Sequence, residues 1–335
     1  MSSELTLHDW QPDLLVGFEQ CPLLLGIPDE RLGGDPIEGP VATLVRPVDH
    51  LRSDRAVLFV HGWNDYFFQT HVADYWREQG YAFYALDLRR YGRSWVEGQL
   101  RGYASDLTEY FEEINLAVSE LQAHHTRLVL MGHSTGGLIA SLYAHEHPGL
   151  FDALVLNSPW LELQGGPLAR ALGPVIKSLG QQRPTAALRL SDVDFYKKTI
   201  HVSEGGEWDY DLALKSSAIA EIRVGWLRAI LRGHDRVAEG LSIDCPILVL
   251  CSDRSDFARK WSEELRTADV VLDVKQIAKR AVNLGRLVTV VRIEGAVHDV
   301  TLSAEPVRLR AFAEITRWLS AYGPTQAYAS AAATA

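Results

Sequence analysis

The clearest chemical motif is the pentapeptide GHSTG at positions 132–136, which follows an apolar run and precedes a helical pattern. A serine between a strand and a helix, with glycine two residues away on either side, is typical of a nucleophile on a very tight turn. Side chains at Gly132 or Gly136 would clash in such a turn, and the helix beginning there directs its positive end toward developing negative charge. We therefore predict that Ser134 is a catalytic nucleophile.

A serine nucleophile needs a general base, and position along the chain selects one of the 12 histidines. A histidine with a pKa near 6.5 can accept the serine proton at neutral pH if it lies beside the nucleophile, at the carboxyl edge of a sheet. His298 follows the last apolar segment, residues 288–293, and so meets this condition. We predict that His298 is the general base.

The acid that orients the base should lie between the serine and the histidine in the chain. From Asp269 to His298 the separation is 298 − 269 = 29 residues, which fits a helix, a strand and short connections of about 25–30 residues in all. From Asp253, the first aspartate after the apolar run 247–250, it is 298 − 253 = 45 residues. We therefore prefer Asp269 and keep Asp253 as the alternative, with residues 257–266 as a small helical insertion between them. Asp256 and Asp273 are the other candidates in this region.

A tripeptide, His61-Gly62-Trp63, follows the apolar run 56–60. When a nucleophilic serine occupies a strand-to-helix turn, the oxyanion hole is made by the backbone N–H after the serine and one from a loop after a neighbouring strand. We predict that the amides of Trp63 and Thr135 form this hole. Glycine at position 62 would let the backbone approach the substrate oxygen closely.

Short apolar runs alternate with helical patterns along most of the chain, which predicts a mostly parallel, doubly wound α/β sheet. The clearest helical pattern covers residues 106–124, where apolar positions recur at three and four residues. Ligands bind such sheets at the carboxyl ends of the strands. The predicted strands are residues 41–45, 56–60, 81–86, 128–131, 153–156, 247–250 and 288–293.

The alternation stops between residues 159 and 240, where glycine, proline and scattered aromatic residues precede a helical pattern at 218–232. This segment is predicted to be a lid that leaves the α/β sheet and returns to it, over the strand ends. The domains are then residues 1–158 and 241–322 for the core, 159–240 for the lid, and 323–335 for a flexible tail. Aromatic side chains exposed on the lid could be buried in a homodimer.

The 335 residues carry a formal net charge of −10, which argues against a nucleic-acid partner and against binding to an anionic membrane. Three cysteines, an odd number without zinc spacing, favour a reducing compartment. The sequence shows neither a signal peptide nor a run of about 18 apolar residues. We expect a cytoplasmic protein without a transmembrane segment, metal or organic cofactor.

With these motifs, the chain resembles the α/β-hydrolase superfamily and, more narrowly, its serine aminopeptidase/monoacylglycerol-lipase-like branch. The resemblance covers roughly residues 40–320, and it implies a cap between the core strands and the acid strand. Two departures stand out. Arg90 and Tyr91 occupy places where the family loop holds a glycine, and CSDRSDF replaces the usual glycine-then-aspartate turn. The motifs are HGW at 61–63, YALDLRRYGRS at 84–94, GHSTGG at 132–137, NSPW at 157–160 and GAVHDV at 295–300.

The predicted reaction is hydrolysis of a small-molecule carboxylic ester through an acyl-enzyme. A serine aminopeptidase is the alternative within the same chemistry, and it would need an acidic group in the lid to bind the substrate amine. An acyltransferase would use the same triad. A binding protein on a hydrolase scaffold is disfavoured, because nucleophile, base and both turn glycines are present. The acidic residues available for an amine are Glu204, Glu207 and Asp209.

Overall fold

The structure, a computed structural model, describes residues 9–26, 39–164, 166–188, 195–215 and 221–324. Within these residues, nine strands form one sheet in the order β1-β2-β3-β5-β4-β6-β7-β10-β11. Neighbouring strands from β5 to β11 are parallel, and β1, β2 and β3 extend one edge with antiparallel pairing. The strands are β1 (Gln11–Pro12), β2 (Phe18–Leu24), β3 (Val41–Pro47), β4 (Arg55–Val60), β5 (Ala82–Asp87), β6 (Arg127–His133), β7 (Ala153–Asn157), β10 (Ile247–Ser252) and β11 (Val288–Ile293).

All seven predicted strands are present, so the expectation of a mostly parallel α/β sheet is confirmed. Strands β1 and β2 are additional. In β2 the side chains of Phe18, Cys21 and Leu23 are buried while Pro22 and Leu24 are exposed. Such alternation marks a strand near a sheet edge, which a search for fully apolar runs does not detect.

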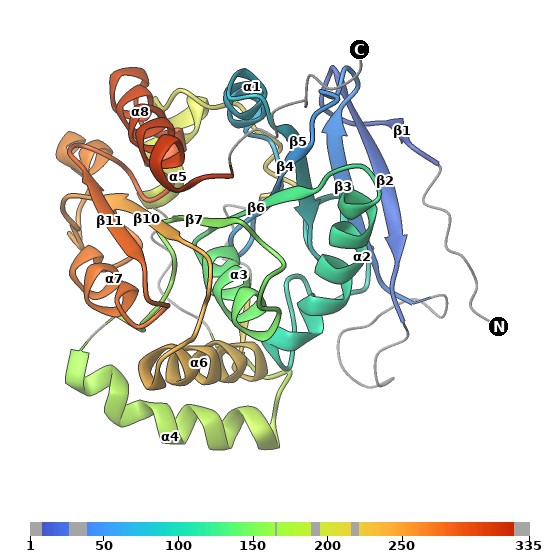
Figure 1. Ribbon diagram of the computed structural model, residues 1–335. Helices are drawn as coiled ribbons and strands as arrows, with labels where there is room; N and C mark the ends of the chain where they lie inside the picture. The colour runs from blue at the N-terminus through green and yellow to red at the C-terminus, as the bar shows by residue number, and fades with distance from the viewer. Residues whose placement is uncertain (1–8, 27–38, 165, 189–194, 216–220, 325–335) are drawn as a thin grey trace, which may run out of the picture.

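Helices cover both faces of the sheet (Figure 1). Alternate residues of the central strands face opposite sides, so Leu58 and Leu130 belong to one apolar core, and Val57 and Val129 to the other. Helices α2, α3, α6 and α7 contribute to the first core, and α1 and α8 to the second. The helices are α1 (Thr70–Glu78), α2 (Phe111–Gln122), α3 (Thr135–Glu146), α4 (Gly166–Gln182), α5 (Phe195–Ile200), α6 (Val224–Glu239), α7 (Val274–Ala281) and α8 (Glu305–Tyr322).

The helical pattern predicted at residues 106–124 is confirmed, with a tighter first turn. Asp106 caps a 3₁₀ turn, Leu107–Tyr110, by accepting a hydrogen bond from the backbone N–H of Thr108, and the Glu109 carboxylate bonds back to the amide of Asp106. Helix α2 then continues without a break. This capping box fixes where the helical segment begins.

Residues 159–240 contain helices α4, α5 and α6 and a short ribbon of β8 (Ala187–Leu188) with β9 (Ile222–Arg223). None of the described residues in this segment adds a strand to the large sheet. Helices α4 and α6 lie side by side at the bottom of the view in Figure 1. The helix predicted at 218–232 instead begins at Val224 and extends to Glu239, because Arg223 is extended and pairs with Ala187. Residues 218–220 lie outside the described residues, as does the predicted tail from residue 325 onward.

The helical insertion predicted at residues 257–266 is wrong. The segment holds only a 3₁₀ turn, Glu263–Thr267. Backbone groups here form hydrogen bonds with side chains and not with one another along a helix. The Arg254 guanidinium donates to the carbonyl oxygen of Glu264, and the Asp256 carboxylate accepts from the amide of Ala258.

No helix in the described ranges has the length and apolar character needed to cross a bilayer. All three cysteines are buried and unpaired. Burial raises the pKa of the Cys245 and Cys251 thiols to about 12. These thiols therefore stay protonated near neutral pH and act as small apolar side chains.

Candidate active site

Ser134 occupies a strained turn between β6 and α3. Its φ is +51°, a backbone conformation that costs on the order of 1–3 kcal/mol for a residue with a side chain. A Cβ atom at Gly132 would lie 2.6 Å from the carbonyl oxygen of Gly136, and a Cβ at Gly136 would overlap the carbonyl oxygen of His61. Both glycines are therefore required by close backbone contacts, which hold the serine hydroxyl clear of the turn.

Ser134, His298 and Asp269 form one hydrogen-bonded chain. Nε2 of His298 lies 3.0 Å from Oγ of Ser134, and Nδ1 lies 2.9 Å from Oδ2 of Asp269. All three side chains are buried, with Asp269 completely enclosed. The other carboxylate oxygen of Asp269 accepts hydrogen bonds from the amides of Val271 and Leu272. The carboxylate is thus fixed so that it can hold Nδ1 protonated and leave Nε2 free to accept the serine proton.

Asp269 reaches this place by an excursion of the chain after β10. Residues 255–268 leave the sheet and return, so that Asp269 pairs alongside Ser255 at the end of the strand. The amide of Asp269 donates to the carbonyl oxygen of Arg254, and the amide of Asp256 donates to the carbonyl oxygen of Asp269. The acid therefore occupies the position directly after β10, although it is distant from β10 in sequence.

The alternative acid, Asp253, has a different contact. Its Oδ1 accepts a hydrogen bond of 3.1 Å from the amide of Gly295, in the turn that leads to His298. Asp256 bonds to Arg254, and Asp273 caps helix α7. Among the described residues, Asp269 is the only one of the four candidate aspartates with a hydrogen bond to His298.

The loop after β4 places Trp63 on the other side of the nucleophile. A Cβ atom at Gly62 would lie 3.2 Å from Cβ of Ser134, so glycine allows the close approach of the two segments. Within the described residues, the backbone N–H groups of Trp63 and Thr135 donate no hydrogen bond. Both residues line the same pocket as Ser134. Two unpaired amides beside a nucleophile are the arrangement that stabilises an oxyanion.

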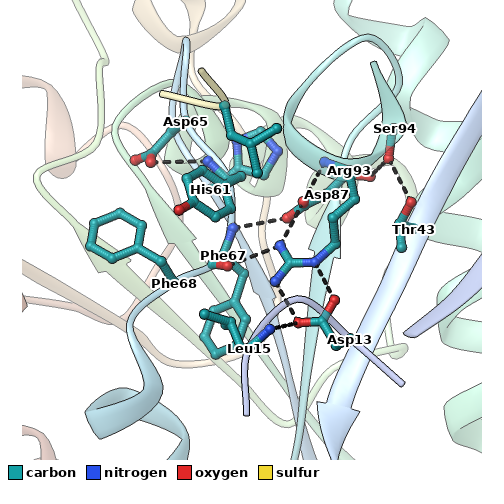
Figure 2. A network of polar contacts seen from close by, with 12 residues as sticks. Asp13, Leu15, Thr43, His61, Asp65, Phe67, Phe68, Asp87, Arg93 and Ser94 are labelled. Carbon is teal, nitrogen blue, oxygen red and sulfur yellow. Dashed lines mark hydrogen bonds and ion pairs between the residues drawn. The ribbon is translucent and has the colours of Figure 1, made fainter. Parts of the chain in front are cut away.

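A buried ion-pair network supports this loop from behind (Figure 2). Arg93 lies between Asp13 and Asp87, with Nε–Oδ1 and Nη1–Oδ2 distances of 2.6 and 2.8 Å. Asp87 also accepts from the amide of Phe67, and Arg93 donates to the carbonyl oxygen of Phe67. Although burial by itself would lower the pKa of Arg93, the two carboxylates raise it, so the guanidinium stays charged. The loop is therefore anchored through its backbone at Phe67.

A second polar network lies behind His298. Asp299 is fully buried and accepts hydrogen bonds from Asn157 on β7 and from the amide and hydroxyl of Thr301. Burial would raise the pKa of Asp299, but the nearby His133 and these hydrogen bonds lower it to about 2. The backbone carbonyl oxygen of Asn157 also accepts a hydrogen bond from the amide of Ser134. Asn157 and Asp299 lie in the NSPW and GAVHDV motifs, but the sequence assigned neither a role, because the contact between them joins segments far apart in the chain.

A cavity of about 940 Å³ opens in front of Ser134 and His298. The polar residues of its wall that were not identified from the sequence include Tyr196, whose ring packs edge-on to His298 at 5.4 Å, and Lys215, which pairs with Asp65. No cluster of metal-binding side chains occurs in the part of the chain that the structure describes. The apolar lining includes Trp63, Trp160, Leu163, Leu188, Phe195, Ile222, Trp226, Leu227, Phe257, Val270, Val271 and Leu272.

Comparison with known proteins gives consistent matches. The family model described as serine aminopeptidase, S33, matches residues 52–302. A monoacylglycerol lipase of Mycolicibacterium smegmatis is 28% identical over 205 residues, which cover 59% of this chain and 69% of that protein. A phospholipase of Bacillus subtilis is 25% identical over 187 residues, which cover 54% of this chain and 68% of that protein.

Solved structures share the fold. A soluble variant of the Saccharomyces cerevisiae monoglyceride lipase has a TM-score of 0.65 at 17% identity, covering 91% of this chain and 98% of that one. The Paleococcus ferrophilus monoacylglycerol lipase has a TM-score of 0.60 at 21% identity, covering 82% and 96%. The family model spans most of the chain and the solved structures confirm the α/β-hydrolase fold. The chain therefore belongs to the serine aminopeptidase S33 family of the α/β-hydrolase superfamily, as its motifs predicted.

Proposed function

We propose that this protein hydrolyses carboxylic esters through an acyl-enzyme on Ser134, with His298 as general base and Asp269 as the orienting acid. One observation carries the proposal: His298 bridges Ser134 and Asp269 with hydrogen bonds of 3.0 and 2.9 Å at the floor of a large pocket. Serine, histidine and aspartate in this order and contact perform acyl transfer on several unrelated folds.

In the first step, His298 takes the hydroxyl proton of Ser134 as the serine oxygen attacks the ester carbonyl. The amides of Trp63 and Thr135 bind the resulting oxyanion, and Asp269 stabilises the imidazolium. His298 then gives its proton to the leaving alcohol, which produces the acyl-enzyme. Water, activated by His298, releases the acid and restores the serine.

The two relatives named above are a monoacylglycerol lipase and a phospholipase, and these names denote hydrolases of lipid esters. The protein is therefore a carboxylic ester hydrolase. The pocket supports a narrower proposal. Its mostly apolar lining would hold an aliphatic acyl chain, while Asn64, Asp65 and Lys215 form a polar part of the wall. We therefore propose monoesters with an apolar acyl chain and a small polar alcohol as substrates.

The segment 159–240 is proposed to act as the cap over this pocket. It supplies Trp160, Phe195 and Trp226 to the lining, and helix α6 brings Trp226 to within 5.5 Å of Trp63, measured between ring centroids. Cap residues thus share the pocket with the residues proposed for catalysis. The cytoplasmic location and the homodimer stay predictions.

The aminopeptidase alternative receives no support from the acidic residues that it needs. Glu207 pairs with Arg308 at 2.6 Å, and Glu204 lies 3.6 Å from Lys197. Asp209 has a side chain that is 88% exposed. None of the three acids is among the residues that line the pocket in the described part of the chain. No observation favours an acyltransferase.

The test compares wild type, Ser134→Ala, Asp269→Asn and Asp253→Asn on p-nitrophenyl acetate and butyrate. We expect Ser134→Ala to abolish turnover and Asp269→Asn to lower kcat by about 10⁴, because the imidazole loses its correct tautomer. Asp253→Asn is the matched control, because an amide oxygen can still accept from Gly295. Absence of wild-type turnover together with absence of labelling by a fluorophosphonate would overturn the proposal.

A further inference from the structure

An ion pair is buried in the pocket wall, between the proposed cap and the loop that carries Trp63. Nζ of Lys215 lies 2.7 Å from Oδ1 of Asp65, and their side chains are only 8% and 2% exposed. Both residues line the pocket that contains Ser134. Two charges taken out of water are costly unless they are paired, so each strongly constrains the position of the other.

Asp65 lies two residues after Trp63, on a short stretch of unusual backbone. Asn64, between them, has a φ of +51°, and Oδ1 of Asp65 also accepts from the amide of Tyr66. The far end of the loop is held at Phe67 by Asp87 and Arg93, as Figure 2 shows. That anchor acts four residues beyond Trp63, whereas the pair with Lys215 holds the loop two residues beyond it, from the side of the cap.

The segment that carries Lys215 is itself firmly attached to the core. The amide of Asp211 donates to the hydroxyl of Tyr66, and the indole N–H of Trp208 donates 2.7 Å to the carbonyl oxygen of Leu302. A small separate apolar core joins cap residues to the Trp63 loop and to the turn that carries His298. Its buried members are Tyr66, Phe68, Ile200, Tyr210, Val297 and Leu302.

Aromatic rings also surround the ammonium of Lys215. Nζ lies 5.2 Å from the ring centroid of Phe68, 5.4 Å from that of Tyr196 and 5.5 Å from that of Tyr210. Such rings attract a cation and limit the positions that it can take. The Lys215 side chain is thus confined on several sides. Such confinement is expected of a residue that fixes a loop, and not of one that moves with the substrate.

We propose that Lys215 is a positioning residue for the oxyanion hole: through Asp65 it holds the loop that presents the Trp63 amide to the substrate carbonyl. This inference rests on the proposed function and goes beyond it, because it makes the cap part of the catalytic apparatus. The cap segment 195–215 then fixes both the loop that carries Trp63 and the turn that carries His298. Its packing against the core is needed for a complete oxyanion hole.

The test measures kcat and KM for p-nitrophenyl acetate and butyrate with wild type, Lys215→Met, Asp65→Asn and the double variant. We expect each variant to lower kcat by about ten- to a hundredfold with little change in KM, because a donor displaced by a fraction of an ångström stabilises the transition state less. The Ki of butylboronic acid, whose serine adduct places an oxygen in the same hole, should rise by a similar factor.

Lys177→Met is the matched control, because Lys177 also forms an ion pair within residues 159–240, with Asp235, but on the surface. It should keep wild-type kinetics. If a single variant fails to fold, the double variant is decisive, because it leaves no unpaired buried charge and should stay folded while kcat remains low. Lys215→Arg, which keeps the charge, should recover part of kcat.

Two results would overturn the inference. One is a folded Lys215→Met or double variant with wild-type kcat and boronic-acid affinity. The other is a change confined to KM, which would make Lys215 a substrate-binding group and not a positioning one. In either case wild type would still lose activity on Ser134→Ala, so the proposed function would stand. If the wild-type protein itself were inactive, that result would contradict the proposed function and not only this inference.

Discussion

At the scale of single residues, the site depends on backbone conformations that most side chains avoid. Ser134, Asn64 and Arg90 all have positive φ values, of 51°, 51° and 65°. Asparagine tolerates this region and a nucleophile in a tight turn requires it, but arginine gains nothing from it locally. Position 90 is the place where the family loop usually holds glycine, and the φ value gives the physical reason.

The Arg90 side chain offsets this strain through contacts that glycine cannot make. It is completely buried, and its Nη1 donates 2.5 Å to the carbonyl oxygen of Tyr103 and lies 3.7 Å from Glu109. We expect Arg90→Ala to destabilise the fold by about 2–3 kcal/mol, since it keeps the strain and leaves polar groups unsatisfied. Arg90→Gly should be less destabilising by about 1 kcal/mol, because it removes the strain. Urea unfolding of both variants measures the difference, and an alanine variant as stable as the glycine variant would contradict it.

At the scale of elements, the site is made where helix α3 begins against the end of β4. Gly136, in the first turn of the helix, packs so closely on the backbone of His61 and Val60 that no Cβ atom fits. The contact brings the loop with Trp63 next to Ser134. The geometry of the proposed oxyanion hole is therefore a consequence of helix-on-strand packing at one glycine.

Gly136→Ala should disrupt this contact. The added methyl group meets backbone and not a flexible side chain, so helix and strand must separate. We expect a loss of about 2 kcal/mol or more in unfolding free energy, and a fall in kcat of at least tenfold. Thermal unfolding and p-nitrophenyl butyrate kinetics measure both.

The matched control is Gly173→Ala in helix α4. A Cβ atom there meets no other residue within 4 Å, but Pro174 follows and offsets the usual helix-forming advantage of alanine. This variant should be close to wild type in stability, with unchanged kcat. If Gly136→Ala behaved in the same way as Gly173→Ala, tight packing at the turn would not be what fixes the site.

At the scale of the whole molecule, two histidines, one half-buried and one buried, make stability depend on pH. The ring of His71, in α1, stacks on Trp208 at 4.3 Å and bonds to the carbonyl oxygen of Thr301. His234, in α6, bonds to the carbonyl oxygen of Trp160. Burial lowers the pKa of both histidines to about 4. Both rings are therefore neutral in the folded protein across the range in which the unfolded chain takes up protons.

The unfolding free energy should fall as the pH decreases from about 6.5 to 4. The unfolded chain binds a proton on each histidine near pH 6.5, and the folded protein only near pH 4, so the stability present above pH 6.5 is lost in this window. Each histidine contributes up to about 3 kcal/mol to the loss. Urea unfolding between pH 7 and 4 measures the slope, which His71→Gln and His234→Gln should each reduce. A flat profile in wild type would contradict the assignment of neutral buried rings.

The sequence predicts those parts of the site that leave a pattern within a few neighbouring residues. The pairing of Gly132 and Gly136 around Ser134 is a local signal, because the turn itself excludes side chains. Apolar runs likewise marked the central strands, which are buried on both faces. Strand β2, next to the sheet edge, was missed because its residues alternate between buried and exposed. The helix predicted at 257–266 was wrong because side-chain hydrogen bonds satisfy the backbone there.

The sequence by itself determined the fold class, the position of the proposed nucleophile and the order of the chemical groups, because strand burial, a tight turn and chain order leave local patterns. Spacing also favoured Asp269 over Asp253. Only the tertiary structure decided how Asp269 lies beside β10, that Asp253 supports the turn before His298, and that Lys215 meets Asp65. These are contacts between segments far apart in the chain, and their energies depend on burial and distance, which no local pattern encodes.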